Sequence, residues 1–359
     1  SDAEKQAVMG VLDREFLGMG AEVQQFEEML TDFFGRPTVC VSSGTSALHL
    51  ALKSTGIGVG DEVLVQSLTY VASFQAISAT GATPVACDVD AETLCLNWRD
   101  AEKRLTPKTK AVMPIHYAGG VGSLDEIYAF AKKYGLRVIE DAAHAFGTDY
   151  KSKKVGGFGD IVCFSFDGIK NITSGEGGCI VTDDKVILQK IRDARLLGVE
   201  NDSDKRFSGE RSWFFDVTSQ GWRYHMSNIM AAIGIEQLKR FPEMAKKRRF
   251  LAKKYDEKLF QNHSINLLKQ DYNEIVPHIY VIRFSEGIDR EYVREKLAEK
   301  GIQTGIHYIP NHWLSAYQSQ KKKIETVDTV FPSIVSLPLH SDMKACDVEF
   351  ICKTLNEIS

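Results

Sequence analysis

Short apolar runs alternate with helix-like segments over the first part of the chain. The runs that we expect to be strands span residues 38–41, 62–65, 84–88, 111–115 and 137–140. Strands separated by helices favour right-handed crossovers and a mostly parallel sheet with helices on its faces. The alternation therefore predicts an α/β fold, in which ligands bind beyond the carboxyl ends of the strands.

Boundary signals place helices between these runs. Residues 22–34 have apolar side chains at helical spacing, and Gly35 follows as a stop signal. Another helix is expected to begin near Tyr70. Ser123-Leu-Asp-Glu126 is a capping box, which predicts a helix that ends at Gly135.

The C-terminal third of the chain fits a second domain, because 359 residues allow one large domain and a smaller one. Residues 235–259 predict a long helix that is interrupted near Pro242. Residues 276–284 predict a strand and residues 290–300 a helix. We expect the domains to divide as 1–240, which would carry the site and any cofactor, and 241–359.

One lysine lies between two apolar runs that we expect to be buried strands, residues 161–166 and 179–182. Burial would disfavour the ammonium of Lys170, so its pKa should fall and its free amine could act as a Schiff-base nucleophile. The alternative is a solvated lysine, which is the ordinary case in a loop. The hydroxyl of Ser165, at the end of the first run, could bind an anion.

A glycine turn joins the run 38–41 directly to a helix-like segment that ends at Gly56. The first backbone N–H groups of a helix are unpaired and favour an anion, so a phosphate could bind at Gly44, Thr45 and Ser46. An ordinary serine or threonine N-cap is the alternative. The turn is not a P-loop, because the Gly-Lys-Ser/Thr ending is absent.

Asp141 directly follows the run 137–140. It could be a metal ligand, a general base or the partner of a protonated heterocyclic nitrogen. Only His144 lies near it in sequence at a possible ligand spacing, so a metal site is not favoured. With a buried lysine and phosphate-binding candidates, the layout is the one that pyridoxal phosphate needs. Tyr70 could cover the ring, or it could be a core aromatic.

Charge and cysteine usage argue against several classes of function. Lys and Arg number 44 against 48 Asp and Glu, a net charge of −4 that gives no support for nucleic-acid or membrane-surface binding. No apolar run reaches the roughly 18 residues of a membrane span, and the first residues do not resemble a signal peptide. The seven cysteines form no CxxC pair, which fits reduced thiols in a cytoplasmic protein. No GxGxxG follows a predicted strand, so a nicotinamide dehydrogenase is not favoured.

Eight short motifs occur in order along almost the whole chain. The sequence resembles the sugar aminotransferases of the DegT/DnrJ/EryC1/StrS family, which have the fold type I of aspartate aminotransferase. The motifs span residues 17–27 (LGMG, then FE), 43–51 (SGTSALHLA), 69–72 (TYVA), 140–145 (EDAAHA), 164–178 (FSF, then KN, then GEGG), 221–226 (GWRYHM), 305–308 (GIHY) and 336–340 (SLPLH).

This resemblance implies a role for each matching residue. Lys170 would form the Schiff base with pyridoxal phosphate and then move a proton between the two carbons that react. Asp141 would pair with the pyridine nitrogen, His144 would lie near the ring hydroxyl, and Tyr70 would stack on the ring. The phosphate would be held by Gly44, Thr45 and Ser165.

The resemblance also implies a homodimer with a shared active site. In the family, the stretch matching 221–226 comes from the neighbouring subunit, and its third residue, often asparagine, reaches the phosphate. Here that residue is Arg223, a departure that leaves its contact open. His307 and Tyr308 resemble residues on the nucleotide-sugar side of the site. The polar stretch 204–213 is expected to be a mobile loop near the entrance.

The activity implied is the transfer of an amine from L-glutamate to the ketone of a UDP- or dTDP-linked keto-sugar, with pyridoxamine phosphate formed on the way. The product would serve surface glycans such as lipopolysaccharide O-antigen. Two alternatives stay open. The first is a sugar dehydratase, although those known in the family carry histidine where Lys170 stands. The second is a regulatory member that binds a partner without turnover.

Overall fold

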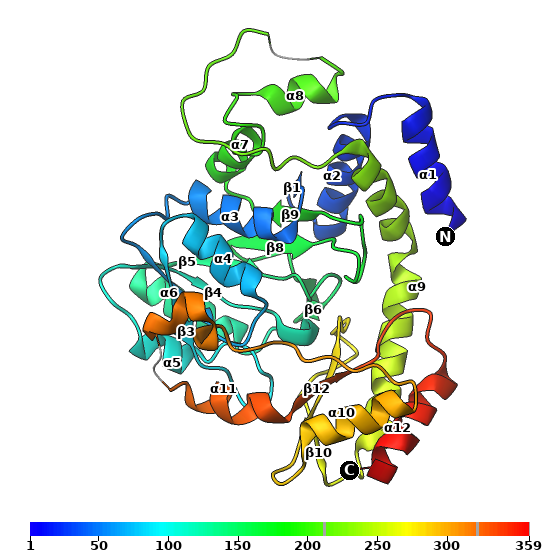
Figure 1. The fold of residues 1–359 in the computed structure, drawn as a ribbon. Helices are drawn as coiled ribbons and strands as arrows, with labels where there is room; N and C mark the ends of the chain where they lie inside the picture. The colour runs from blue at the N-terminus through cyan, green and yellow to red at the C-terminus, as the bar shows by residue number, and fades with distance from the viewer. Residues whose placement is uncertain (211–212, 321–322, 359) are drawn as a thin grey trace.

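The computed structural model describes residues 1–210, 213–320 and 323–358. Its centre is a seven-stranded sheet with the strand order β1-β9-β8-β5-β4-β2-β3 (Figure 1). The strands of this sheet are β1 (Thr38–Val41), β2 (Glu62–Gln66), β3 (Thr83–Cys87), β4 (Thr109–Met113), β5 (Arg137–Asp141), β8 (Ile161–Ser165) and β9 (Gly178–Val181).

The sheet is parallel except at β9. Strand β2 pairs in parallel with β3 and β4, β4 pairs with β5, and β5 pairs with β8. Strand β9 runs antiparallel to both β8 and β1. The carboxyl ends of the parallel strands therefore meet at one edge, which brings Val41, Asp141 and Ser165 to the same side. The α/β fold predicted from the sequence is confirmed.

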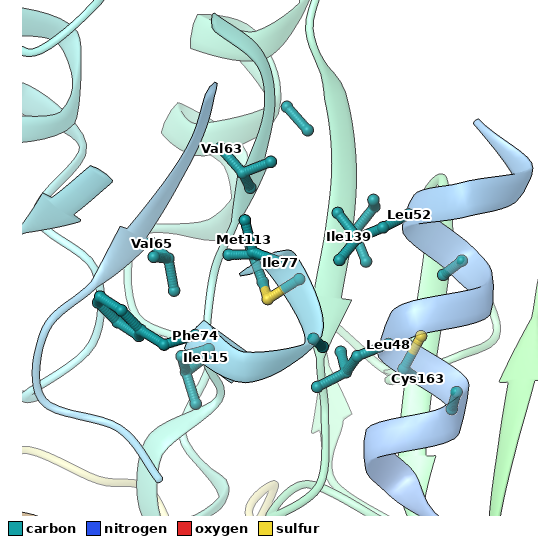
Figure 2. Packing of buried hydrophobic residues seen from close by; sticks show 14 of the residues in the cluster. Leu48, Leu52, Val63, Val65, Phe74, Ile77, Met113, Ile115, Ile139 and Cys163 are labelled. Atoms are coloured by element: carbon teal, nitrogen blue, oxygen red, sulfur yellow. The ribbon is translucent and has the colours of Figure 1, made fainter. Parts of the chain in front are cut away.

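Helices cover both faces of the sheet, because successive side chains of a strand point to opposite faces. The helices of the large domain are α1 (Asp2–Asp13), α2 (Ala21–Phe34), α3 (Gly44–Ser54), α4 (Val71–Ala79), α5 (Trp98–Lys103), α6 (Leu124–Tyr134), α7 (Lys185–Ala194) and α8 (Asp202–Phe207). In β1, Val39 and Val41 join the core under α3 and α4, whereas Cys40 joins the core under α2 and α9 (Asn228–Leu259). Figure 2 shows Leu48 and Leu52 of α3 in the first of these cores.

A smaller α+β unit follows. Strands β10 (Ile265–Leu267), β11 (Tyr280–Phe284) and β12 (Ile334–Leu337) form an antiparallel sheet in that order. This sheet shares a core with the second half of α9, with α10 (Arg290–Glu299) and with α12 (Ala345–Ile358). The remaining elements are the short strands β6 (Asp149–Tyr150) and β7 (Lys153–Lys154), helix α11 (Glu325–Val330) and the 3₁₀ turns Tyr117–Gly119, Asn311–Trp313, Ser315–Gln320 and Phe331–Ser333.

Helix α9 spans the boundary that we expect between residues 240 and 241. Its first half contacts α1 and α2, and its second half contacts α12 and β10. Helix α11 returns from the small domain to the large one (Figure 1). There Val327 packs into the main core, and its backbone N–H donates a hydrogen bond to the carboxylate of Asp88. The division into 1–240 and 241–359 remains a proposal.

Several local predictions are wrong. The Ser123 side chain makes no capping hydrogen bond, because its ψ of 60° is not the extended backbone of a side-chain cap; α6 nevertheless ends at Gly135. Helix α9 continues through Pro242 without a break, since the buried side chains on either side, Leu238 and Ala245, hold it against the core. Part of the predicted loop 204–213 belongs to α8, and residues 211–212 of it lie outside the described residues.

All seven cysteines are free thiols, and six of them are buried. Among the residues described, no helix is long and apolar enough to cross a membrane.

Candidate active site

A cavity of about 390 Å³ opens at the carboxyl edge of the sheet. It brings together most of the residues singled out in the sequence, although they are spread over 265 positions of the chain. Those that line it are Gly44, Thr45, Tyr70, Asp141, His144, Ser165, Lys170, His307 and Tyr308. Ser46 and Arg223 do not line it.

Lys170 lies in the turn that follows β8, where its backbone N–H donates to the carbonyl of Asp167. Burial lowers the pKa of Lys170, and the carboxylates of Asp141 and Asp167 act in the opposite direction. The amine is therefore more readily deprotonated than that of a surface lysine. This direction is the one expected from the two apolar runs that flank Lys170 in the sequence. A nucleophilic amine beside a buried carboxylate is the feature on which the rest of the site depends.

Asp141 is the last residue of β5, and its carboxylate is buried. The hydroxyl of Ser73 donates to Oδ2 over 2.8 Å, and the N–H of Ala143 donates to Oδ1 over 3.2 Å. Burial raises the pKa of Asp141, whereas these two hydrogen bonds lower it. No signal in the sequence singles out Ser73, because its position at the site depends on where α4 packs.

The N-terminus of α3 faces the same cavity. Ser43 caps the helix by accepting a hydrogen bond from the N–H of Ser46, so the N-cap alternative applies to this pair. The hydroxyl of Ser46 turns toward those of Ser42 and Ser43. A Cβ atom on Gly44 would come within 2.8 Å of the Cβ of Ser165. Only glycine allows α3 to begin this close to the end of β8. The first N–H groups of α3 have no partner within the helix and can bind an anion.

His144 and Tyr308 form a hydrogen-bonded pair. Nδ1 of His144 accepts from the N–H of Ala118 over 3.3 Å, and Nε2 lies 2.9 Å from the Tyr308 hydroxyl. Burial and the neighbouring Lys170 hold the pKa of His144 well below its usual value, so the ring is neutral. Its single proton therefore sits on Nε2 and is donated to Tyr308.

The segment that contains His307 and Tyr308 also lines the cavity. Nδ1 of His307 lies 2.7 Å from the hydroxyl of Ser336 in β12, and Tyr117 donates to the His307 carbonyl. The rings of Tyr70 and Tyr308 are 5.5 Å apart. Tyr70 and Tyr308 thus border the same opening. Burial lowers the pKa of His307 to about 4.

A second residue that sequence reasoning missed is His278. Its Nε2 lies 3.5 Å from the Nζ of Lys170, and its ring centroid is 4.5 Å from that of His144. His278 falls in a run that we interpreted only as a strand, and it in fact precedes β11. No spacing in the sequence connects it with Lys170, because 108 positions separate the two.

Arg223 lies elsewhere on the molecule. Residues 223–225 run beside the edge of the large sheet, where the N–H of Ser42 donates to the Tyr224 carbonyl and His225 bridges to Val41. The Arg223 side chain is exposed and borders a separate hollow with Arg206. Within one chain it therefore does not reach the cavity.

The residues around the cavity fit pyridoxal phosphate. The cavity offers an amine of lowered pKa, a buried carboxylate for a ring nitrogen, a helix N-terminus for a phosphate and a tyrosine ring at its rim. These are the groups by which proteins bind and tune this cofactor. Among the described residues, no cluster of three or more His, Cys, Asp or Glu side chains could hold a metal ion.

Comparison with known proteins gives matches along the full chain. Residues 1–356 match the profile of the DegT/DnrJ/EryC1/StrS aminotransferase family. The chain is 38% identical to the spore coat polysaccharide biosynthesis protein SpsC of Bacillus subtilis over 99% of its own length and 94% of that protein.

Solved structures give the same result. The putative sugar aminotransferase Spr1654 of Streptococcus pneumoniae in its PMP form superposes with a TM-score of 0.92 at 29% identity, covering 100% of this chain and 95% of that one. PseC of Helicobacter pylori, an aminotransferase involved in the biosynthesis of pseudoaminic acid, superposes with a TM-score of 0.91 at 28% identity, covering 99% and 96%.

Proposed function

Because this chain belongs to the DegT/DnrJ/EryC1/StrS aminotransferase family, we propose that it transfers an amine from L-glutamate to the ketone of a nucleotide-linked keto-sugar. It is a pyridoxal-phosphate-dependent sugar aminotransferase of fold type I. When bound, the cofactor supplies an electron sink for the carbon that loses its proton. One observation carries the assignment of residues, namely that the amine of Lys170 and the buried carboxylate of Asp141 face one cavity.

Lys170 would hold the cofactor covalently and serve as the acid and base of the reaction. Because its pKa is lowered, Nζ gives up a proton more readily than the amine of a surface lysine does. The carboxylates of Asp141 and Asp167 keep that pKa from falling further. An amine that can exist in both forms is what proton movement between two carbons requires.

Asp141 would hold a proton on the ring nitrogen of the cofactor. Its two hydrogen-bond donors, Ser73 and the N–H of Ala143, fix the carboxylate at the end of β5 and stabilise its charge. The N–H groups at the start of α3 and the hydroxyl of Ser165 would bind the phosphate at the other end of the cofactor. Tyr70 would cover one face of the ring.

The sugar and the donor are the finer parts of the proposal. The names of two similar proteins, SpsC and PseC, place them in the biosynthesis of spore coat polysaccharide and of pseudoaminic acid. These names support an amino-sugar product for a surface glycan. His307 and Tyr308 would contact the sugar side of the substrate, because they line the same cavity as Lys170. A nucleotide-linked keto-sugar fits a cavity whose rim is aromatic, since tyrosine rings can pack against sugar and base alike.

A homodimer with shared sites is also part of the proposal. The exposed side chain of Arg223 lies outside the cavity of its own chain, so it is free to reach the phosphate in a partner. Arginine binds phosphate through two parallel N–H groups, which would compensate for the missing asparagine. We place the enzyme in the cytoplasm, a location that its seven unpaired thiols support.

An absorbance spectrum tests this function. The protein is mixed with pyridoxal phosphate, and the visible band of the attached cofactor is followed as L-glutamate is added. The proposal expects the band to disappear with glutamate and to return with a keto-sugar nucleotide, together with a product whose mass shows a gained amine. A visible band that does not respond to glutamate would overturn the assignment of glutamate as the amine donor. A product that has lost oxygen would indicate that the protein is a sugar dehydratase.

A further inference from the structure

The amine of Lys170 meets an imidazole that comes from the C-terminal part of the chain. Nε2 of His278 lies 3.5 Å from Nζ of Lys170, and the His278 side chain is buried, with 4% of the residue exposed. His278 precedes β11 of the small sheet, whereas Lys170 follows β8 of the large sheet. The contact therefore joins the two parts of the molecule at the reactive amine.

The backbone around His278 is held in place by a buried arginine. Nη1 of Arg248 in α9 lies within hydrogen-bond distance of three carbonyl oxygens, those of Pro277 at 3.4 Å, His278 at 3.1 Å and Leu339 at 3.3 Å. Among the described residues no carboxylate pairs with this buried guanidinium, so the carbonyls offset the cost of burying its charge. The position of the His278 peptide is thus fixed by the core of the small domain.

The residue next to Lys170 provides a second attachment. Nδ2 of Asn171 donates to the carbonyl of Val276 over 3.2 Å and to that of Phe146 over 3.1 Å. Because Asn171 follows Lys170 and Val276 lies two residues before His278, the two segments run side by side. These bonds hold the backbone before His278 close to the backbone that carries Lys170.

His278 acts as a neutral ring. Burial, followed by its neighbours His144, Lys170 and Arg248, holds the pKa of His278 well below its usual value. A neutral imidazole has one donor and one acceptor nitrogen. Within the described part of the chain, Nδ1 is buried without a hydrogen-bond partner, and Lys170 is the partner of Nε2. Among the residues described, the hydrogen-bond contact of this ring is therefore with the reactive amine.

The free amine of Lys170 needs such a contact. The carboxylates of Asp141 and Asp167 lie near it and raise the pKa of Lys170. The rings of His144 and His307 also lie near it, and Lys170 lowers the pKa of each. When the amine is released and protonated, its N–H groups need acceptors, and among the described residues Nε2 of His278 lies within hydrogen-bond distance of Nζ. We propose that His278 is a positioning residue that accepts a hydrogen bond from the protonated amine of Lys170 and holds it at the cavity while it is free. This role rests on the proposed function of Lys170 as the reactive lysine.

Competitive labelling of the full chain without cofactor tests the proposal. Trace acetic anhydride is applied over a range of pH, and acetylation of the Lys170 peptide is quantified by mass spectrometry, which gives the pKa of Lys170. Loss of an acceptor should lower that pKa by about one to two units in His278→Phe, because a hydrogen bond to a charged group contributes roughly 1.5–3 kcal/mol. His278→Gln, which keeps an acceptor oxygen, should shift it less.

His49→Phe is the matched control. His49 is a histidine that is also 4% exposed, but its ring packs against Trp222 and Tyr224. The Lys170 pKa should not change in this variant. An unchanged Lys170 pKa in a folded His278→Phe protein would overturn the proposal, as would an equal shift in the control.

A second measurement covers the case in which His278→Phe does not fold. In the chain with ¹⁵N-labelled histidine, the Nε2 resonance of His278 should move when Lys170 is replaced by Met, and an unchanged resonance would contradict the contact. Borohydride trapping of pyridoxal phosphate distinguishes failure of this proposal from failure of the proposed function. If Lys170 is not trapped, the proposed function is wrong, but the pKa of Lys170 measured by labelling still tests the contact with His278.

Discussion

The hydroxyl of Ser73 donates a hydrogen bond to the buried carboxylate of Asp141, with Oγ 2.8 Å from Oδ2. The two residues are 68 positions apart, and α4 and β5 bring them together. Burial raises the pKa of Asp141 and this bond lowers it, so Ser73 helps the carboxylate to remain ionised. Ionised Asp141 is the form that can keep a ring nitrogen protonated.

Ser73→Ala should therefore raise the pKa of Asp141 further. A lost hydrogen bond to a charged group corresponds to about one pKa unit or more, so the acidic limb of the kcat/KM profile should move to higher pH by that amount. Ser78→Ala, on the same helix but directed at Tyr317, is the control and should leave the limb in place. A profile that is the same for Ser73→Ala and the unaltered chain would remove Ser73 from the site.

Asp141→Asn should stabilise the protein without cofactor while abolishing activity. The pKa of Asp141 is higher in the folded chain than in the unfolded one, so the unfolded state loses its proton first and stability falls as pH rises from the unfolded pKa through the folded one. Asparagine removes this loss. The free energy of unfolding of the variant, relative to the unaltered chain, should increase between pH 3 and neutral pH in urea titrations. A constant difference over this range would contradict the assigned pKa direction.

Gly44→Ala should weaken cofactor binding by about tenfold or more, because the new Cβ would lie 2.8 Å from the Cβ of Ser165 and one of the two segments must move. Gly58→Ala is the matched control, since its Cβ would meet only the Thr80 carbonyl at 3.8 Å. Affinity for pyridoxal phosphate can be measured by fluorescence quenching. Equal affinities for the two variants would show that the start of α3 does not form the phosphate site.

Shared active sites predict that a variant with weakened cofactor retention and an inactive variant restore one another. Arg223→Ala should weaken cofactor retention, and Lys170→Ala should abolish activity. A mixed dimer of the two would contain one site that combines an intact Lys170 with an intact Arg223 from the other chain. Activity should therefore appear after the two variants are unfolded and refolded together. Mixtures that stay inactive, although mass spectrometry shows mixed dimers, would place Arg223 outside its partner's site.

Much of the fold follows from local signals in the sequence. The strand at Thr38–Val41 and the helix ending before Gly35 are where the sequence predicts them, because a short apolar run and a left-handed glycine act locally. The capping box at Ser123 is wrong because the backbone there is not extended. The break at Pro242 is wrong because packing of the helix on both sides outweighs the local preference.

The cavity itself could be predicted only in part. Asp141 and Ser165 lie at strand ends, where the topology of a parallel sheet collects them. Ser73 and His278 carry no such signal. Each is defined by a side-chain contact across a long sequence separation, so it becomes visible only when the helices and the small domain are placed.

The most direct test of the central claim is to locate the cofactor on the chain. The protein is incubated with pyridoxal phosphate, reduced with borohydride and digested, and the modified peptide is identified by mass spectrometry. The structure predicts a phosphopyridoxyl group on Lys170, at one equivalent per chain, and none on the exposed Lys185. Modification spread over surface lysines, with Lys170 unmodified, would contradict the account.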